Sequence, residues 1–322
     1  MPMSEFVTIA GGGLSAEIAT AGAAVRAVHL DGFAHSLVVG AADPENYTAG
    51  NREYLGATIG RFANRIGEGR FTIDGRGSQL ARNDPPNHLH GGPKGFSTRI
   101  WTIVERAPDA LTLSLVSADG DEGYPGTVEI TARFAILPDQ TLSVSYEATS
   151  DRPTPVNLTT HFYFNLDGSD DIRGHRLTLA ADRYLPIDAA ALPTGTIAPV
   201  AGTPFDFGAG RLVGEAPDPL DHNFCLADAP EAAPRLAARL AGAASGITLA
   251  LSTTEPGLQV YDGAKLDGSI MGHGGVSIGS RSALALEPQG WPDSPNRPEF
   301  PQAILRPGET YRHHSLYRFS AG

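Results

Sequence analysis

The residue types that could move protons gather in five short polar segments of this chain. The segment 156–166 (VNLTTHFYFNL) places His161 among asparagines, threonines and aromatic residues. An imidazole exchanges protons near neutral pH, so a histidine in such a stretch suits general acid or base catalysis. The alternative is a histidine whose ring is satisfied inside the core, and the residue types alone leave both interpretations open.

A second segment combines an amide and a guanidinium with glycines. Residues 60–67 (GRFANRIG) place Asn64 beside Arg65. A guanidinium is a rigid fork of donors that suits sugar hydroxyls or carboxylates, and glycines let the backbone approach a ligand. A surface salt bridge is the simpler role for Arg65.

A third segment, residues 87–96 (NHLHGGPKGF), contains two histidines. His88 and His90 are two apart, so on a strand they would share one face and could ligate a metal. We find no recognisable set of further ligands in the sequence and expect no metal site. The pair Gly91–Gly92 predicts a turn that holds His90 at the edge of a cavity.

The last two segments each contain a carboxylate. Asp221 stands in LDHNFCL, where it could bind a ligand or simply cap a turn. Glu287 ends the apolar run LALE, close to Trp291. Burial beside the tryptophan would raise the pKa of this carboxyl and suit it as a general base. The plain alternative is an exposed glutamate at a strand end.

The candidate groups are two histidines, two carboxylates, one arginine and the amide of Asn64 from these segments, together with the amide of Gln259 in residues 257–261. The sequence contains no P-loop and no GxGxxG fingerprint. Cys225 lies among hydrophobic residues without an activating motif, so we interpret it as inert. The chemistry that remains is proton transfer between a histidine acid and a carboxylate base on a neutral polyol.

Strands must position these segments, because helical patterns are scarce. The 38 glycines and 25 prolines break any long 3.6-residue periodicity. Residues 141–148 (TLSVSYEA) alternate with period two, as a half-buried strand does. The other predicted strands are 101–104, 111–117, 127–137, 156–166, 175–181, 247–253, 257–261 and 282–287.

Two segments are helical candidates, 43–51 and 230–241, although the second could equally be an alanine-rich loop. Many short strands with turn-rich joints predict an all-β sandwich or barrel. We detect no internal repeat and no long linker, so we expect a single domain over residues 1–322.

The charge balance excludes two classes of partner. The chain of 322 residues carries 24 Lys and Arg against 36 Asp and Glu, a formal net charge of −12. Nucleic acids and anionic membrane surfaces need clustered cations, so we expect neither as a partner. One cysteine fits a reducing compartment. We see no signal-peptide pattern and no run of roughly 20 apolar residues, and we expect a cytoplasmic protein.

A series of motifs, in order from about Tyr54 to Phe319, resembles the aldose 1-epimerase (galactose mutarotase) family. The motifs are GATIGRFANRI, NHLHGGPKGF, SADGDEGYPG, VNLTTHFYFNL, AADRYLPID, PTGTIAPVAGTPFDF, LDHNF, GLQVYDG, ALALEPQGWPDSPNRPEF and RPGETY. Each motif alone is weak, but together they are highly specific. The resemblance implies a large antiparallel β-sandwich whose open cleft binds a monosaccharide, with no metal or organic cofactor in the chemistry.

The resemblance also implies roles for individual side chains. His161 resembles the family's general acid, which protonates the ring oxygen, and Glu287 resembles the base that removes the proton of the C1 hydroxyl. His90 resembles a second histidine, which binds the sugar near the ring oxygen. The ligands of the sugar hydroxyls would be Asp221, Arg65, Asn64 and Gln259. Together they would open the hemiacetal and reclose it as the other anomer.

The chain departs from the family pattern beside both catalytic candidates. Thr160 and Phe162 flank His161 where the family often has polar residues, and Gly290 and Trp291 alter the stretch beyond the base. No catalytic group is lost, but the preferred sugar stays open. The sequence also leaves open whether the protein is a monomer or a homodimer.

Two functions of other classes compete with anomer interconversion. One is non-catalytic sugar binding on the same fold. The other is glycoside processing with Asp221 and Glu287 as the carboxylate pair, whose separation would then set a retaining or an inverting outcome.

Overall fold

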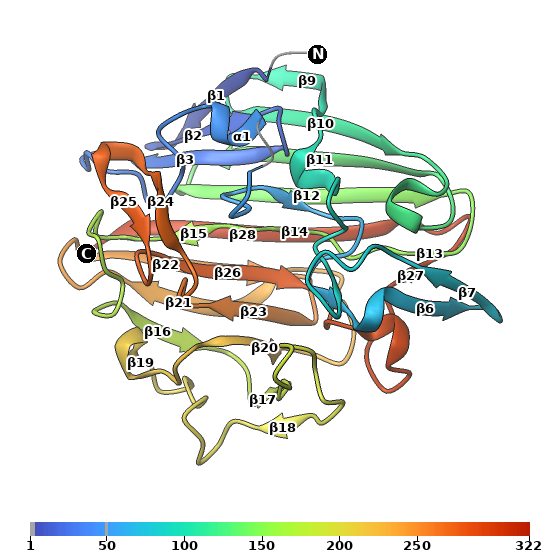
Figure 1. Cartoon of the computed structure of the whole chain (residues 1–322). Coiled ribbons are helices and arrows are strands. Elements are labelled where there is room, and N and C mark those ends of the chain that lie inside the picture. The colour runs from blue at the N-terminus through green and yellow to red at the C-terminus, as the bar shows by residue number, and fades with distance from the viewer. Residues whose placement is uncertain (1–3, 49–50) are drawn as a thin grey trace.

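A nine-stranded antiparallel sheet forms one layer of the protein (Figure 1). The computed structural model describes residues 4–48 and 51–322. In spatial order the strands are β19 (Arg211–Leu212), β16 (Arg176–Leu179), β21 (Arg235–Ala241), β22 (Ile247–Thr253), β28 (Tyr311–Ala321), β12 (Thr141–Ser150), β11 (Val128–Leu137), β10 (Ala110–Ser117) and β9 (Thr102–Ala107). Along β11 successive residues are buried and exposed in turn, so one face of the sheet lies on the core.

A six-stranded antiparallel sheet forms the facing layer. Its strands are β15 (Tyr163–Phe164), β26 (Leu284–Gln289), β23 (Gly257–Tyr261), β20 (Asp221–Cys225), β17 (Arg183–Tyr184) and β18 (Ala198–Pro199). Val260 and Leu286 of this sheet lie in the same buried cluster as Leu249 and Leu251 of the nine-stranded sheet. The core therefore fills the space between two sheets, and the predicted all-β sandwich is confirmed.

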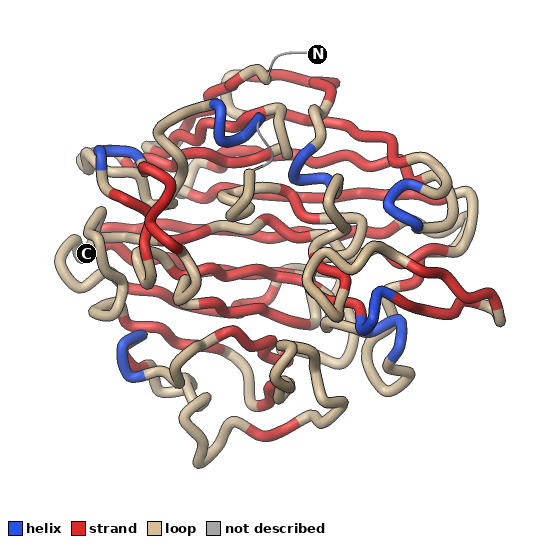
Figure 2. The backbone as a smooth tube through the Cα atoms, viewed as in Figure 1, coloured by secondary structure: helices blue, strands red, loops and turns tan. Residues whose placement is uncertain are grey.

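Smaller elements complete the fold around the sandwich (Figure 2). A three-stranded sheet consists of β1 (Phe6–Gly11), β2 (Leu14–Ala19) and β3 (Ala24–Leu30). The strand pairs are β4 (Thr58–Ile59) with β14 (Thr159–Thr160), β5 (Arg65–Ile66) with β8 (His88–Leu89), β6 (Arg70–Ile73) with β7 (Arg76–Gln79), β13 (Thr154–Pro155) with β27 (Ile304–Leu305), and β24 (Asp267–Met271) with β25 (Ser277–Gly279).

The described helices are all short. They are α1 (Glu45–Thr48) and the 3₁₀ turns η1 (Gly67–Gly69), η2 (Phe96–Thr98), η3 (Asp121–Gly123), η4 (Val213–Glu215), η5 (His273–Gly275) and η6 (Ser294–Asn296). None of them has the length and apolar character needed to span a membrane. Of the predicted helix 43–51, only Glu45–Thr48 is helical, and residues 49 and 50 lie outside the described part of the chain.

Two other sequence predictions are wrong in detail. Residues 230–241 are not helical: Arg235–Ala241 form β21, because backbone pairing with β16 and β22 outweighs the helix propensity of alanine. The segment 156–166 is not one strand. It is divided between β14 and β15, which pair with different strands, and His161 lies between them. The other predicted strands are present with their ends shifted by up to three residues.

A buried arginine holds the loops next to the sandwich. The Arg61 guanidinium donates to the carbonyl oxygens of Ser117, Ala118, Pro125 and Gly126. Burial lowers the pKa of this guanidinium to about 10. Charge-assisted hydrogen bonds of this kind are strong because water does not compete for them. They fix the loop 117–126 against the segment that leads into Asn64.

Candidate active site

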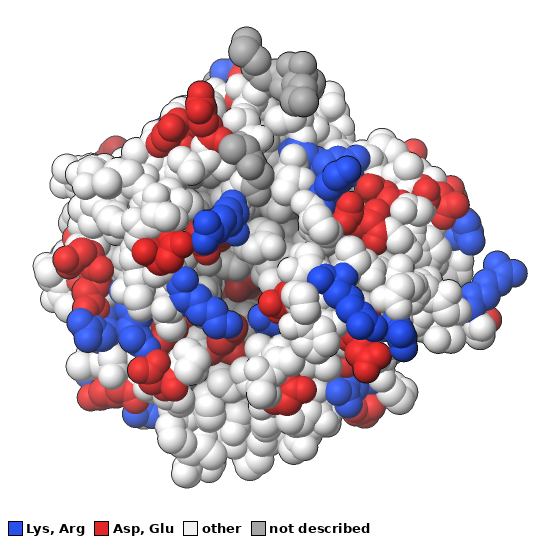
Figure 3. All heavy atoms as spheres, viewed as in Figure 1, with Lys and Arg blue, Asp and Glu red and all other residues white. Residues whose placement is uncertain are grey.

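Strand alternation aims a row of polar side chains away from the core. Leu286 and Val260 pack between the sheets, whereas their neighbours Glu287 and Gln259 are paired across β26 and β23 on the other face. Asn223 of β20 continues the row as the partner of Gln259. The surface is hollowed near the centre of the view in Figure 3, and acidic and basic side chains lie in the hollow.

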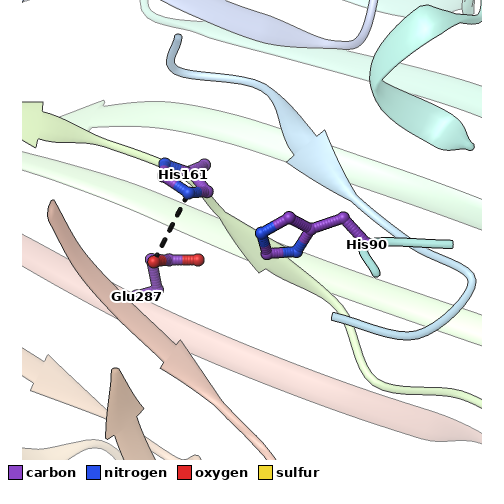
Figure 4. Close-up of side chains that lie close together, drawn as sticks. All are labelled: His90, His161 and Glu287. Carbon is purple, nitrogen blue, oxygen red and sulfur yellow. Dashed lines mark ion pairs between the residues drawn. The ribbon is translucent and has the colours of Figure 1, made fainter. Parts of the chain in front are cut away.

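His161 and Glu287 form a close pair at the centre of the site (Figure 4). Nε2 of His161 lies 3.5 Å from Oε1 of Glu287, and the residues are 4% and 2% exposed. Burial and the charge of Asp221 raise the pKa of Glu287 well above its ordinary value, against the opposing effect of Arg65. Burial lowers the pKa of His161 to about 3. Both shifts favour the neutral form of each group, a protonated carboxyl beside a neutral imidazole.

His90 stands beside this pair with its tautomer fixed. The His90 ring centre is 5.4 Å from that of His161. The backbone N–H of Asn64 donates to Nδ1 of His90 at 3.1 Å, and burial, reinforced by His161 and Arg65, holds the pKa of His90 well below its ordinary value. A neutral ring whose Nδ1 accepts must carry its proton on Nε2. His90 therefore offers an N–H donor to a ligand.

The same three residues could be mistaken for a metal site. One ligand atom from each of His90, His161 and Glu287 can be chosen so that all lie within 4.8 Å of one another. However, Nδ1 of His90 is already bonded to the Asn64 N–H, and Nε2 would have to lose its proton before it could bind a metal. The arrangement suits hydrogen bonding and proton transfer better than metal ligation.

A guanidinium and a carboxylate lie near the pair, since Arg65 and Asp221 both act electrostatically on Glu287. Nε of Arg65 donates to Asp84 at 2.7 Å. Arg65 is 8% exposed whereas the Asp84 side chain is 38% exposed, so the salt bridge considered for Arg65 is buried only at its arginine end. Nε2 of Gln259 donates to Oδ1 of Asp221 at 2.6 Å. These bonds orient a fork of donors and an acceptor toward the same region.

Asn157 connects the two halves of the site. Its amide accepts a hydrogen bond from Gly290 N at 2.7 Å and donates to the carbonyls of Gly290 and Ala63. Gly290 follows closely after Glu287, and Ala63 precedes Asn64. The buried amide therefore fixes the end of β26 relative to the loop of Asn64 and Arg65.

Three tyrosines near the site were not predicted from the sequence. The Tyr54 ring stacks on His161 and meets His90 edge-on at 4.7 Å, and the Tyr163 ring lies 4.8 Å from that of His161. Tyr261 packs edge-on against Tyr163. Tyr163 could have been found from its two-residue spacing to His161, whereas nothing in the sequence around Tyr54 marks it.

The structure brings all seven candidate residues together but corrects several expectations. His88 does not share a face with His90, because His90 has a φ of 50° and leaves the strand, while His88 bonds to Tyr124 and Ala81. Asp221 begins a strand and does not cap a turn. The alternative of an exposed Glu287 is wrong as well, because this residue lies within β26, buried.

The departures from the family pattern are absorbed by packing. Phe162 lies in the main core against Tyr317, and Thr160 bonds to the Tyr146 hydroxyl. Trp291 belongs to a separate cluster with Cys225, and the raised pKa of Glu287 comes from its burial and from the charge of Asp221. An effect of these residues on sugar preference stays a prediction.

Comparison with known proteins gives a consistent result. The family model described as "Aldose 1-epimerase" matches residues 5–318. The galactose mutarotase of Rattus norvegicus is 43% identical over 317 residues, which cover 95% of this chain and 91% of the relative. The aldose 1-epimerase of Escherichia coli K12 is 40% identical over 303 residues, with 90% and 87% covered.

Solved structures agree with the sequence comparison. The crystal structure of an aldose epimerase homologue from C. elegans superposes with a TM-score of 0.93 at 32% identity, and 99% of each chain is covered. The galactose 1-epimerase of Lactobacillus acidophilus gives a TM-score of 0.85 at 29% identity, with both chains fully covered.

The raised pKa of Glu287 predicts that the stability of Glu287→Gln, relative to wild type, increases as the pH rises. The folded protein holds the Glu287 proton more tightly than the unfolded chain does, so this carboxyl removes stability as pH rises above its unfolded pKa of about 4.5. Glutamine has no such proton. We expect the melting temperature of the variant, relative to wild type, to increase between pH 5 and pH 8.

The exposed Glu147→Gln serves as the matched control, and its effect on stability should stay within about 0.5 kcal/mol. Calorimetry on the three proteins tests the prediction. A Glu287→Gln difference that stays constant or reverses with rising pH would contradict the assigned pKa direction.

Proposed function

The chain belongs to the aldose 1-epimerase family, and we propose that it interconverts the α and β anomers of a free aldose with His161, Glu287 and His90 as its catalytic groups. The observation that carries this proposal is the buried pair of Glu287 and His161 at 3.5 Å, in which burial favours the neutral form of both groups. The reaction needs one group that takes a proton and one that gives it. The relatives named galactose mutarotase and aldose 1-epimerase support the same isomerase activity.

The proton balance of the reaction fits this pair. Opening the ring removes the proton from the C1 hydroxyl, and the C1–O1 bond becomes a carbonyl. The bond between C1 and the ring oxygen breaks, its electrons stay on that oxygen, and the oxygen is protonated. The sugar gains and loses one proton, so the pair ends with the same number that it held at the start.

Glu287 acts as the base once its own proton has moved to His161. We propose that this transfer, across the 3.5 Å between Oε1 and Nε2, accompanies sugar binding. Arg65 favours it, because its charge opposes the raised pKa of Glu287. The imidazolium then protonates the ring oxygen, and rotation about C1–C2 exposes the other carbonyl face. Reclosure reverses both proton transfers.

The remaining candidates bind and orient the sugar in this proposal. Nε2–H of His90 donates to the sugar near the ring oxygen, which supports the charge that develops there. The sugar hydroxyls accept from the guanidinium, donate to the carboxylate, and do either with the amides. The residues in this role are Asn64, Arg65, Asp221 and Gln259.

No observation favours the two competing functions. A non-catalytic binding protein does not need a buried acid and base held within proton-transfer reach. Asp221, the second carboxylate of a glycoside-processing pair, is bonded to the amide of Gln259. That bond suits a fixed hydroxyl acceptor.

We further propose that the chain works as a single domain over residues 1–322, as a monomer or a homodimer in the cytoplasm. The family match over residues 5–318 supports one domain. The single cysteine, Cys225, is buried and unpaired, which fits a reducing compartment.

Glu287→Gln should remove most of the activity while the protein stays folded. An amide cannot accept the C1 proton, and general acid–base groups contribute roughly 10²–10⁴-fold to rates. Polarimetry on fresh α-D-glucose and α-D-galactose, corrected for the spontaneous rate, measures the loss. The control is the exposed Glu147→Gln. Near-wild-type turnover in the folded Glu287→Gln protein would exclude Glu287 as the base.

The pH dependence of kcat/KM should lack an acidic limb near pH 6.5. The pair keeps its single proton until His161 is protonated as well, and the pKa of His161 is about 3. Because kcat/KM reports the free enzyme, it should stay level between pH 5 and pH 7. Polarimetry across this range, with the background subtracted at each pH, would refute the proton assignment if the rate halves near pH 6.5.

Chelation should leave the activity unchanged. The tautomer of His90 and the proton shared by His161 and Glu287 disfavour metal ligation, so the reaction should proceed in EDTA. Mutarotation is measured before and after dialysis against EDTA. Activity that is lost in EDTA and returns with zinc would establish a metal-dependent mechanism instead.

A further inference from the structure

A cavity of about 340 Å³ adjoins the end of β26 but is lined by none of the seven candidate site residues. Asn157 and Gly290 form part of its wall. Most of the remaining wall is apolar and comes from Val156, Pro230, Pro256, Pro301, Ala303, Ile304 and Leu305. A volume of this size accommodates a small organic molecule. We call it the Glu255 cavity, after the buried carboxyl in its wall.

No side-chain hydrogen bond among the described residues explains a buried carboxyl at Glu255. Glu255 is 2% exposed, and its Oε1 has no hydrogen-bond partner among the described residues. A buried carboxyl without a partner destabilises the folded state, and an apolar residue or a glutamine would avoid this. The proposed proton transfers do not use it either. Its presence in a cavity wall points to a ligand.

The side chains of β28 that pack near Glu255 do not compensate its carboxyl. On β28, Nδ1 of His313 is 3.9 Å from Oε1, but it is bonded to the Leu158 carbonyl, and burial lowers the pKa of His313 to about 3, so this ring is neutral. Burial raises the pKa of Tyr311 well above its ordinary value, so the phenol is neutral too. The imidazole of His314, next along β28, is bonded to Ser143.

One cation acts on Glu255 from a neighbouring strand. Arg235 of β21 donates to the backbone carbonyl of Glu255 at 2.8 Å and pairs with Glu231. Burial raises the pKa of the Glu255 carboxyl to about 8 even though Arg235 lowers it. Glu309 adds a second carboxylate to the lining, which contains no Lys, Arg or His. The lining therefore has two carboxyl groups and no cationic side chain.

We propose that the Glu255 cavity binds a small organic monocation, whose ammonium or guanidinium group pairs with the Glu255 carboxylate while its apolar body packs on the proline and aliphatic walls. The lone buried carboxyl supplies the specific contact, and the apolar walls supply the contact area. The net charge of −12 favours a cation over an anion at any surface opening.

Binding of the cation is linked to loss of a proton from Glu255. The free carboxyl is protonated below its pKa of about 8, and only the carboxylate forms the ion pair. Affinity therefore falls about tenfold for each pH unit below about 8, and levels off above it. His313 stays neutral across this range, because burial lowers its pKa to about 3.

Cyclohexylammonium is a suitable probe, because it joins one ammonium to a compact apolar ring and stays charged up to pH 9. Isothermal titration at pH 9 and pH 6 measures its affinity for the wild-type protein, with cyclohexanol as the neutral isostere. We expect binding at pH 9, binding roughly 100-fold weaker at pH 6, and no comparable binding of cyclohexanol.

Two matched variants locate the binding. Glu255→Gln keeps the shape of the side chain and should abolish binding of the ammonium at pH 9. Glu287→Gln removes the buried carboxyl of the catalytic cleft and should leave the affinity unchanged. Absence of binding to wild type at millimolar probe, or equal affinity in Glu255→Gln and wild type, would overturn the proposal. Loss in Glu287→Gln alone would place the amine in the catalytic cleft and overturn it as well.

Discussion

The site depends on keeping a carboxyl and an imidazole together in a place that water hardly reaches. Glu287 and His161 are both buried, and burial favours the neutral form of each. A charge on either group alone is unfavourable because the site is buried. Transfer of one proton from Glu287 to His161 charges both groups together, as an ion pair. The pair can therefore donate and accept a proton by itself. The proposed reaction on a neutral sugar requires both of these steps.

The surrounding structure holds that pair beside the groups that we propose to bind the sugar. Asn157 ties the end of β26 to the loop that carries Asn64 and Arg65, through bonds to Gly290 and Ala63. Further out, Arg61 fixes the loop 117–126 through four backbone carbonyls. These two residues are buried polar side chains whose partners are almost all backbone atoms. They position chain segments that no regular sheet connects.

Burial raises the pKa of both Glu287 and Glu255, but the neighbouring groups of the two carboxyls differ. Glu287 lies beside a histidine that can receive its proton, and Arg65 opposes its raised pKa. Glu255 lies beside a histidine whose nearer nitrogen is engaged by the Leu158 carbonyl. The first environment permits proton exchange within the protein, whereas the second leaves the carboxyl to be compensated from outside. The distinction rests on the hydrogen bonds of the neighbouring imidazoles.

The sequence by itself determined the β-rich class and most strand positions, because period-two alternation and turn residues are local signals. Its ordered motifs also named the seven candidate residues. Tertiary structure decided what local patterns cannot encode. Arg235–Ala241 became a strand through its neighbours, and the segment around His161 was divided between two partners. The backbone turn at His90 separated it from His88. Tyr54, the Asn157 bridge and the Glu255 cavity arise from contacts between distant parts of the chain, so no single stretch predicts them.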